Sequence, residues 1–118
     1  MVGAGVTPGA GAPGGSSLDV AVSTAAGRSV LALRGEVDMA SAPLLDERLA
    51  AVVADDRCEV VVDVAEVTFI DAAGLRVLLQ AGQRLAVDGR RLTLRAPSPF
   101  VRRLLDITGL GCELCVEG

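Results

Sequence analysis

The sequence predicts an α/β fold in which helices pack on a mixed, mostly parallel sheet, with the element order β-β-α-β-α-β-α-β. The chain has 118 residues, which is enough for one domain, and 51% of them are apolar, which is enough for a core. Short runs with the two-residue period of strands are joined to longer runs with the helical period of 3.6 residues. This alternation is typical of βαβ units, in which helical segments connect parallel strands.

Two strands are expected at the start of the folded part. Apolar and polar residues partly alternate over 18–25, and a second largely apolar run covers 30–37. The turn sequence Ala26-Gly27-Arg28 lies between them, so we expect a hairpin. Residues 1–17 hold six Gly, two Pro and no charge, and we expect them to form a flexible tail before a domain at 18–118.

The first helix is expected to follow Asp38. Ser41 offers a capping hydroxyl, and Pro43 suits a first helical turn. The run 59–64 is rich in Val, which is typical of a central strand covered on both faces. Residues 65–70 then lead as a loop to the second helix.

The second helix is expected to begin at Asp71, whose carboxylate can accept hydrogen bonds from free N–H groups of the first turn. Gly89 is expected to end this helix. A strand follows at 91–95, and Ser98 and Pro99 supply the cap and first turn of a third helix. Gly109 ends that helix, and a last strand covers 110–116.

The composition excludes several kinds of chemistry. All 11 basic residues are Arg, and the chain has no Lys and no His. A phosphate-binding loop that needs Lys, a catalytic triad and a zinc site built on His are therefore excluded. We expect no enzyme activity, no cofactor and no metal ion. A net charge of -4 and only two aromatic residues argue against a nucleic-acid partner.

The apolar runs and the cysteines indicate the compartment. No apolar run approaches the roughly 20 residues of a membrane span, so no span is expected. Cys58, Cys112 and Cys115 form a sparse, odd set that suits a reducing cytoplasm better than a disulfide framework. Cys112 and Cys115 have C-x-x-C spacing, but in a strand residues three apart point to opposite faces, so we expect no redox or metal site there.

The loops after two of the predicted strands mark the end of the sheet where a ligand or partner is expected. Ligands of open α/β sheets meet the loops past the carboxyl ends of the strands. Asp38 and Asp71 lie in such loops, and the helix at Asp71 offers free N–H groups. Two interpretations stay open: the two carboxylates contact a partner, or they are an ordinary turn residue and an ordinary helix cap.

The same segments resemble a known family. The resemblance covers about residues 18–116 and is carried by Gly35-Glu36-Val37-Asp38, Phe69-Ile70-Asp71-Ala72-Ala73-Gly74-Leu75, Ser98-Pro99 and Thr108-Gly109-Leu110. These motifs resemble the STAS domain, and within it the bacterial anti-sigma factor antagonists (anti-anti-sigma factors). The resemblance implies the STAS fold and a binding function without catalysis. The implied partner is an anti-sigma factor, usually a serine-kinase-type ATPase, whose capture frees a sigma factor for transcription.

The resemblance also implies a form of regulation for which this chain lacks the acceptor. In many members the kinase phosphorylates a Ser directly after the Asp of the Asp-Ser-x-Gly-Leu motif. Here that position is Ala72, followed by Ala73, and neither has a hydroxyl. Two interpretations stay open. The protein is an antagonist that stays in its binding-competent form, or it has kept the fold and lost the kinase partnership.

From the resemblance we expect one partner-binding site at the end of the sheet. It comprises Asp38, Ser41, Asp71, Ala72, Ala73, Gly74, Leu75 and Arg76. Asp38 supplies an acidic contact, Asp71 fixes the loop, and the small residues at 72–74 let the partner's backbone approach. Arg76 is either a charged contact or simply solvated.

Alternative hydroxyls and alternative functions remain. Thr68, Ser41 and Ser98 are interpreted as a strand-end residue and two helix caps rather than as replacement phosphate acceptors. The rival functions are a STAS module outside sigma regulation, such as a scaffold or a regulatory subunit of a lipid-transport complex, and a nucleotide-binding sensor. The sequence leaves the oligomeric state open.

Overall fold

The computed structural model describes residues 18–55, 59–109 and 114–117. The tail expected at 1–17 lies outside the described residues, and so do Cys58 and Cys112.

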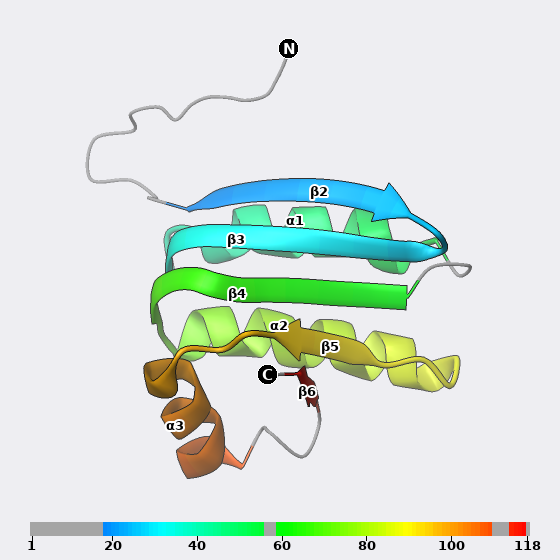
Figure 1. Cartoon of the computed structure of the whole chain (residues 1–118). Helices are drawn as coiled ribbons and strands as arrows, with labels where there is room; N and C mark the ends of the chain where they lie inside the picture. Colours follow the sequence, from blue (N-terminus) through cyan, green and yellow to red (C-terminus); the bar gives the residue numbers. More distant parts are fainter. Residues whose placement is uncertain (1–17, 56–58, 110–113, 118) are drawn as a thin grey trace.

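Within the described residues, one sheet of five strands forms the centre of the fold, in the order β2-β3-β4-β5-β6 (Figure 1). β2 (Asp19–Ala25) and β3 (Arg28–Val37) form the expected antiparallel hairpin. β4 (Glu59–Ile70), β5 (Leu92–Arg95) and β6 (Cys115–Glu117) continue the sheet in parallel with β3. The predicted fold class, a mixed and mostly parallel sheet in an α/β arrangement, is confirmed.

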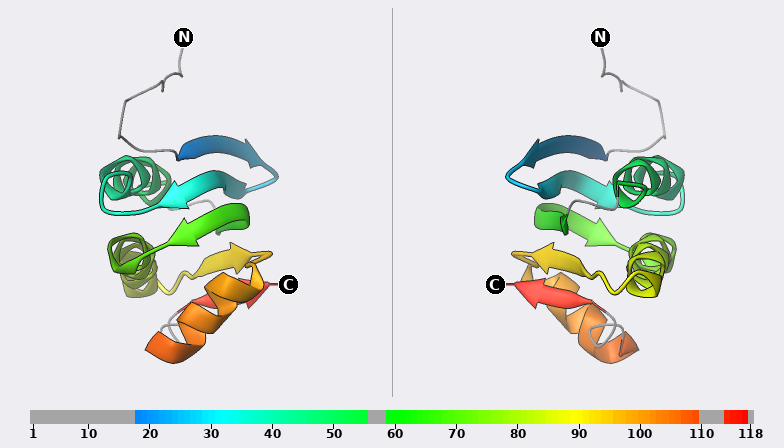
Figure 2. Two further views of the ribbon diagram at one scale, coloured as in Figure 1. Left: turned by 90° about the vertical axis from the view of Figure 1, so that its left-hand side faces the viewer. Right: turned by 90° about the vertical axis from the view of Figure 1, so that its right-hand side faces the viewer.

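Three helices connect the parallel strands. α1 (Ala42–Val53) and α2 (Ala72–Val87) lie side by side on one face of the sheet, while α3 (Pro99–Thr108) lies at the β5–β6 side (Figure 2). The core lies between the sheet and these helices. Its largest fully buried side chains are all aliphatic: Leu31, Leu33, Leu45, Leu49, Ile70, Leu78, Leu85, Leu92, Leu94, Val37 and Val60.

The other face of the sheet carries charged side chains arranged as cross-strand neighbours. Arg28 of β3 pairs with Glu59 of β4, with 3.0 Å between Nε and Oε1. Arg95 of β5 lies between Asp63 and Glu117, at 4.0 and 3.3 Å. Exposed pairs of this kind contribute little stability each. They do balance charge along the face opposite to α1 and α2 (Figure 2).

The predicted turn and helix ends are mostly found where the sequence placed them. The hairpin turn has positive φ at Ala26 and Gly27, 54° and 74°, as a tight two-residue hairpin turn requires. The Ser98 hydroxyl accepts from the backbone N–H of Val101 at 3.2 Å, so its predicted capping role is confirmed. α3 ends at Gly109, which is left-handed with φ of 74°.

β4 is longer than the sequence analysis predicted. It runs on to Ile70, so residues 65–70 are strand and the prediction of a loop there is wrong. Two irregularities in the register between β3 and β4, one of them beside Gly35 with its φ of 106°, let the pairing continue past Val64. Thr68 therefore lies inside the strand, and its hydroxyl donates to the Gly35 carbonyl at 3.2 Å.

The last strand is shorter within the described residues than the predicted 110–116, because β6 begins at Cys115. In the residues that the structure describes, no helix has the length and apolar character needed to cross a bilayer.

Candidate functional site

Two loops meet where β3 and β4 end side by side. Val37 and Ile70 are register partners at the ends of these strands, and Asp38 and Asp71 follow them directly. We call this region the carboxyl end of the sheet: the β3–α1 loop at 38–41, the last residues of β4, and the first turns of α2 and α3. It forms the left-hand side of the molecule in Figure 1.

Ser41 organises the β3–α1 loop from the inside. Its side chain is completely buried. Its Oγ accepts from the backbone N–H of Asp38 at 2.9 Å and lies 3.0 Å from the Glu36 carbonyl oxygen, to which it donates. Ser41 occupies the N-cap position of α1, as predicted, but its hydroxyl makes no capping bond to that helix. The hydroxyl closes the loop instead.

Asp38 is engaged in the same loop. Its Oδ1 accepts from the backbone N–H groups of Ala40 and Ser41, both at 3.0 Å. Its carbonyl oxygen accepts from Ala42 at 2.7 Å, at the start of α1. The geometry accounts for Asp38 as a turn residue, which was one of the two open interpretations. Its side chain is half-buried, and an added contact with a partner stays a prediction.

Asp71 caps α2 as the sequence predicted. Its Oδ1 accepts from the backbone N–H of Gly74 at 3.1 Å, which satisfies one of the free donors of the first turn. Its own N–H donates to the Val37 carbonyl at 3.1 Å. This second bond ties the start of α2 to the end of β3, so the two loops of the carboxyl end form one connected unit.

Gly74 is the point of closest approach between α2 and the strands. A Cβ at this position would lie 2.6 Å from Val37 Cγ1, 2.9 Å from Ile70 Cγ1 and 2.9 Å from the Val37 carbonyl oxygen. The last of these is a backbone atom that cannot move aside without shifting β3. The glycine of the Asp-x-x-Gly-Leu element is therefore required by packing, and Leu75 beside it is 4% exposed.

Three of the predicted contact residues lie inside the protein. Ser41, Gly74 and Leu75 are buried, so in this structure a partner cannot touch these residues directly. Of the small residues at 72–74, which were expected to let the partner's backbone approach, Gly74 is therefore not accessible. The reason is that the first turn of α2 presses Gly74 against the strands, while Ala72 is exposed.

The remaining predicted residues reach the surface. Ala72 and Arg76 are exposed, and Ala73 is half-buried, as is Asp71. Ala72 is the first residue of α2, directly after the capping carboxylate. Contact of any of these residues with a partner stays a prediction.

An aromatic pair at the same end was not predicted. Phe69 near the end of β4 and Phe100 at the start of α3 stack with ring centroids 6.2 Å apart and an interplanar angle of 25°. They are 42% and 47% exposed, and Met39 in the β3–α1 loop is 76% exposed. The sequence feature that could have indicated this pair is that Phe69 and Phe100 are the chain's only aromatic residues. The pair was not predicted because Phe69 was expected to lie in a loop.

The carboxyl end offers few free ligands or unpaired polar groups in the part of the chain that the structure describes. Within residues 18–55, 59–109 and 114–117, no group of three or more Cys, Asp or Glu side chains is arranged as a metal site. The same part of the chain has no buried side-chain polar atom without a hydrogen-bond partner. The buried polar side-chain atoms of these loops are thus hydrogen-bonded within the chain. The surface around Ala72, Phe69 and Phe100 stays accessible to a partner.

A five-stranded mixed sheet with two helices on one face and a capped helix start at its carboxyl end defines a small α/β domain. The family model described as "Mlab, STAS domain" matches residues 20–115. The chain belongs to the STAS domain family, as the sequence motifs implied.

Several similar proteins are named as anti-sigma factor antagonists. The chain is 30% identical over 94 residues to the anti-sigma-F factor antagonist RsfB of Mycobacterium tuberculosis, which covers 80% of this chain and 76% of that protein. It is 33% identical over 78 residues to the anti-sigma-B factor antagonist of Bacillus subtilis, and this alignment covers 66% of this chain and 71% of that protein. A crystal structure of an anti-sigma factor antagonist from Mycobacterium paratuberculosis is similar with a TM-score of 0.78 at 32% identity, covering 86% of each chain.

Proposed function

We propose that this protein is an anti-sigma factor antagonist, which binds an anti-sigma factor through the carboxyl end of its sheet and so frees a sigma factor for transcription. The observation that carries the proposal is the similarity to the mycobacterial antagonist, which extends over most of both chains. We further propose that the protein works in the cytoplasm, where transcription takes place.

The geometry of α2 supports the choice of surface. Ala72 is exposed at the first position of the helix, and a methyl group there leaves room for a partner to approach. Asp71 and Asp38 are held by backbone hydrogen bonds on either side of the junction of β3 and β4. A surface whose loops are already fixed loses little conformational entropy when a partner binds.

We propose that the partner is a serine-kinase-type ATPase and that this chain escapes its regulation. Ala72 occupies the position at which the family resemblance places the phosphorylated serine, and an alanine side chain offers no oxygen to phosphorylate. Phosphorylation would add about 1.5 to 2 negative charges at a helix start that faces the partner. Without it, the antagonist stays in its binding-competent form, and its abundance sets the response.

Co-purification tests the proposed partner. A tagged full-length chain is expressed in its source bacterium, and the proteins that purify with it are identified by mass spectrometry. We expect an anti-sigma factor with a kinase-like ATPase domain. Recovery of the subunits of a membrane transport ATPase instead would favour the rival function as a regulatory subunit of a lipid-transport complex. Calorimetric heat on titration with GTP or ATP would favour the nucleotide sensor.

A charge substitution then tests the surface. Ala72→Glu places a bulky carboxylate at the helix start, and we expect the dissociation constant for the purified anti-sigma factor to rise at least about tenfold, because the added charge must be desolvated in the interface. Gln83→Glu adds the same charge at an exposed position of the same helix, roughly 16 Å further along its axis. The matched variant is expected to bind like the parent. Equal binding by both variants would place the interface elsewhere.

The phosphate acceptor is tested by mass. When the parent protein is incubated with the captured kinase and ATP, its intact mass is expected to remain unchanged and the complex to persist. Stoichiometric phosphate incorporation would contradict the proposal and would point to another hydroxyl, with Thr68 as the nearest exposed one in the sequence.

A further inference from the structure

We infer that Phe69 and Phe100 form the apolar anchor by which the carboxyl end of the sheet holds the anti-sigma factor. The inference rests on the function proposed above and names the residues that supply the binding energy at that site. These residues come from two elements distant in sequence, β4 and α3, and neither belongs to the set that the sequence predicted.

The placement of the aromatic residues is unusual for this chain. It has two aromatic residues in 118, and the core is built from aliphatic side chains alone. Both phenyl rings lie at the surface, 42% and 47% exposed, and they stack on each other rather than on the core centre. Single exposed apolar side chains are ordinary, but adjacent ones of this size mark interaction sites. Aromatic residues are also strongly enriched among the residues that dominate binding energy.

The pair continues the surface already assigned to the partner. Phe69 precedes Asp71 by two residues and Ala72 by three, so the strand end that carries its ring leads directly into the exposed start of α2. Met39, in the loop after the neighbouring strand, adds a third exposed apolar side chain to the same end. The stacked arrangement orders both rings before binding, which reduces the entropy lost when a partner covers them.

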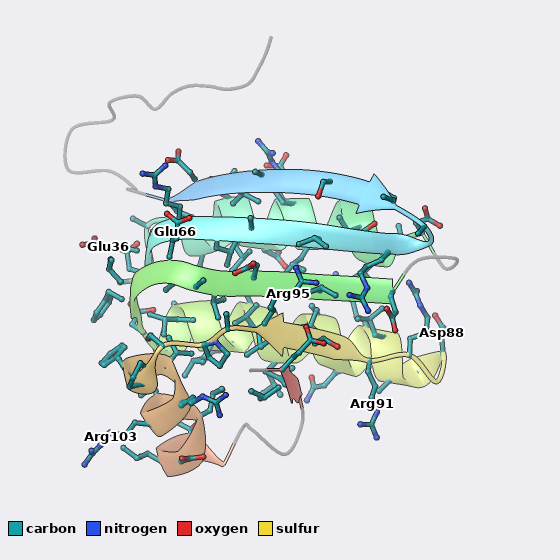
Figure 3. All side chains as sticks on the ribbon, viewed as in Figure 1. Glu36, Glu66, Asp88, Arg91, Arg95 and Arg103 are labelled. Carbon is teal, nitrogen blue, oxygen red and sulfur yellow. The ribbon has the colours of Figure 1, made fainter. Side chains whose placement is uncertain are left out.

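The charge next to the pair indicates the chemistry of the partner. Glu36 of β3 is the register neighbour of Phe69 and is exposed at this end of the sheet (Figure 3). Elsewhere on the sheet, carboxylates such as Glu59 and Glu66 have arginine partners. Glu36 has none among residues 18–55, 59–109 and 114–117. The occupant is therefore an anti-sigma factor with an apolar surface over the rings and a basic group beside it.

Fluorine NMR reads the pair directly, because the chain has only two phenylalanines. Full-length protein labelled with 4-fluorophenylalanine gives two signals, which Phe100→Leu assigns. The probes are the purified anti-sigma factors encoded in the source genome. On adding the one that binds, we expect both signals to shift or broaden. Signals that stay unchanged while binding is complete would overturn the inference. A dependence of both signals on the protein's own concentration would assign the rings to a second copy and would also overturn it.

Binding constants give the second test. Phe100→Ala and Phe69→Ala are each expected to raise the dissociation constant about ten- to a hundredfold, in the range of residues that dominate an interface. Val87→Ala is the matched control, since Val87 is 85% exposed at the far end of α2 and roughly 22 Å from Ala72. It is expected to bind like the parent. Circular dichroism identifies any variant that fails to fold. In that case the fluorine NMR signals of the labelled parent decide whether the two rings contact the anti-sigma factor.

The two proposals fail in different ways. If the parent binds none of the anti-sigma factors, both the proposed function and the proposed aromatic anchor are wrong. If the parent binds and the phenylalanine variants bind equally well, only the anchor is wrong.

Discussion

The carboxyl end of the sheet has an inner and an outer layer, and neighbouring residues of one motif belong to different layers. Ala72 and Gly74 are both small and only two positions apart. Ala72 faces outward at the first position of α2, whereas a Cβ at Gly74 would overlap Val37 and Ile70. Small residues that look equivalent in the sequence thus differ in role: Gly74 lets α2 pack closely against the strands, while Ala72 lies exposed where we propose that the partner binds.

The same division separates the polar residues. Ser41 is buried and keeps its hydroxyl inside the β3–α1 loop, while the position that the family resemblance assigns to a phosphorylated serine is exposed and has none. A hydroxyl in the inner layer holds structure, and a hydroxyl in the outer layer is open to regulation. Substitutions in the inner layer should therefore change stability, and those in the outer layer should change binding.

The largest effect is expected for Gly74→Ala. The added methyl group would push against the Val37 carbonyl and force α2 away from β3, and overpacking of this kind costs about 2 to 3 kcal/mol. The midpoint of thermal unfolding should fall by about 10 °C or more. Gln83→Ala, at an exposed position of the same helix, should leave the midpoint unchanged. An unaltered midpoint in the glycine variant would mean that the first turn of α2 is free to shift.

Ser41→Ala comes next. The substitution removes the acceptor of the Asp38 N–H and a donor to the Glu36 carbonyl in a buried position, which should lower the free energy of unfolding by about 1 to 2 kcal/mol. Ser23→Ala on the exposed strand β2 is the control and should stay within about 0.5 kcal/mol. Urea unfolding of the two variants measures the difference. Equal free energies of unfolding would show that the buried hydroxyl of Ser41 does not stabilise the loop.

The sequence predicted most of the fold because its elements have clear periodicity and clear ends. Asp71, Ser98 and Gly109 were recognised as helix caps, since caps depend on local residue type. The continuation of β4 to Ile70 was missed, because the register shifts against β3 disturb the simple alternation that reveals a strand.

The sequence predicted where the candidate residues lie in the fold, but not which of them reach the surface. Asp38 and Asp71 were expected in loops past the carboxyl ends of two strands, where the structure has them. Burial could not be read from the motif, because the depth of Gly74 depends on how α2 approaches Val37. The pairing of Phe69 with Phe100 joins β4 to α3 across the fold, and no local pattern reports such a contact.

Asp71 lies between the two layers, and Asp71→Ala should have an intermediate effect on the free energy of unfolding. Losing the carboxylate that accepts from Gly74 N–H should cost about 1 kcal/mol, the usual value for an N-cap. Asp71→Asn keeps an acceptor oxygen at the same place and should recover most of this loss. Chemical unfolding compares the two variants. If the alanine variant matched the parent, the cap would contribute nothing and the helix start would depend on packing at Gly74 alone.

Ala72→Ser should have the smallest effect on stability and the clearest effect on regulation. The hydroxyl enters an exposed first helical position, where a surface substitution changes the free energy of unfolding by no more than about 0.5 kcal/mol. Incubated with the captured kinase and ATP, the variant should gain one phosphate by intact mass and leave the complex, while the parent gains none. Because the fold is the same in both, any difference in binding comes from the added charge at the start of α2. Phosphorylation of the parent, or of neither protein by a kinase that binds both, would show that position 72 is not where this partner regulates its antagonist.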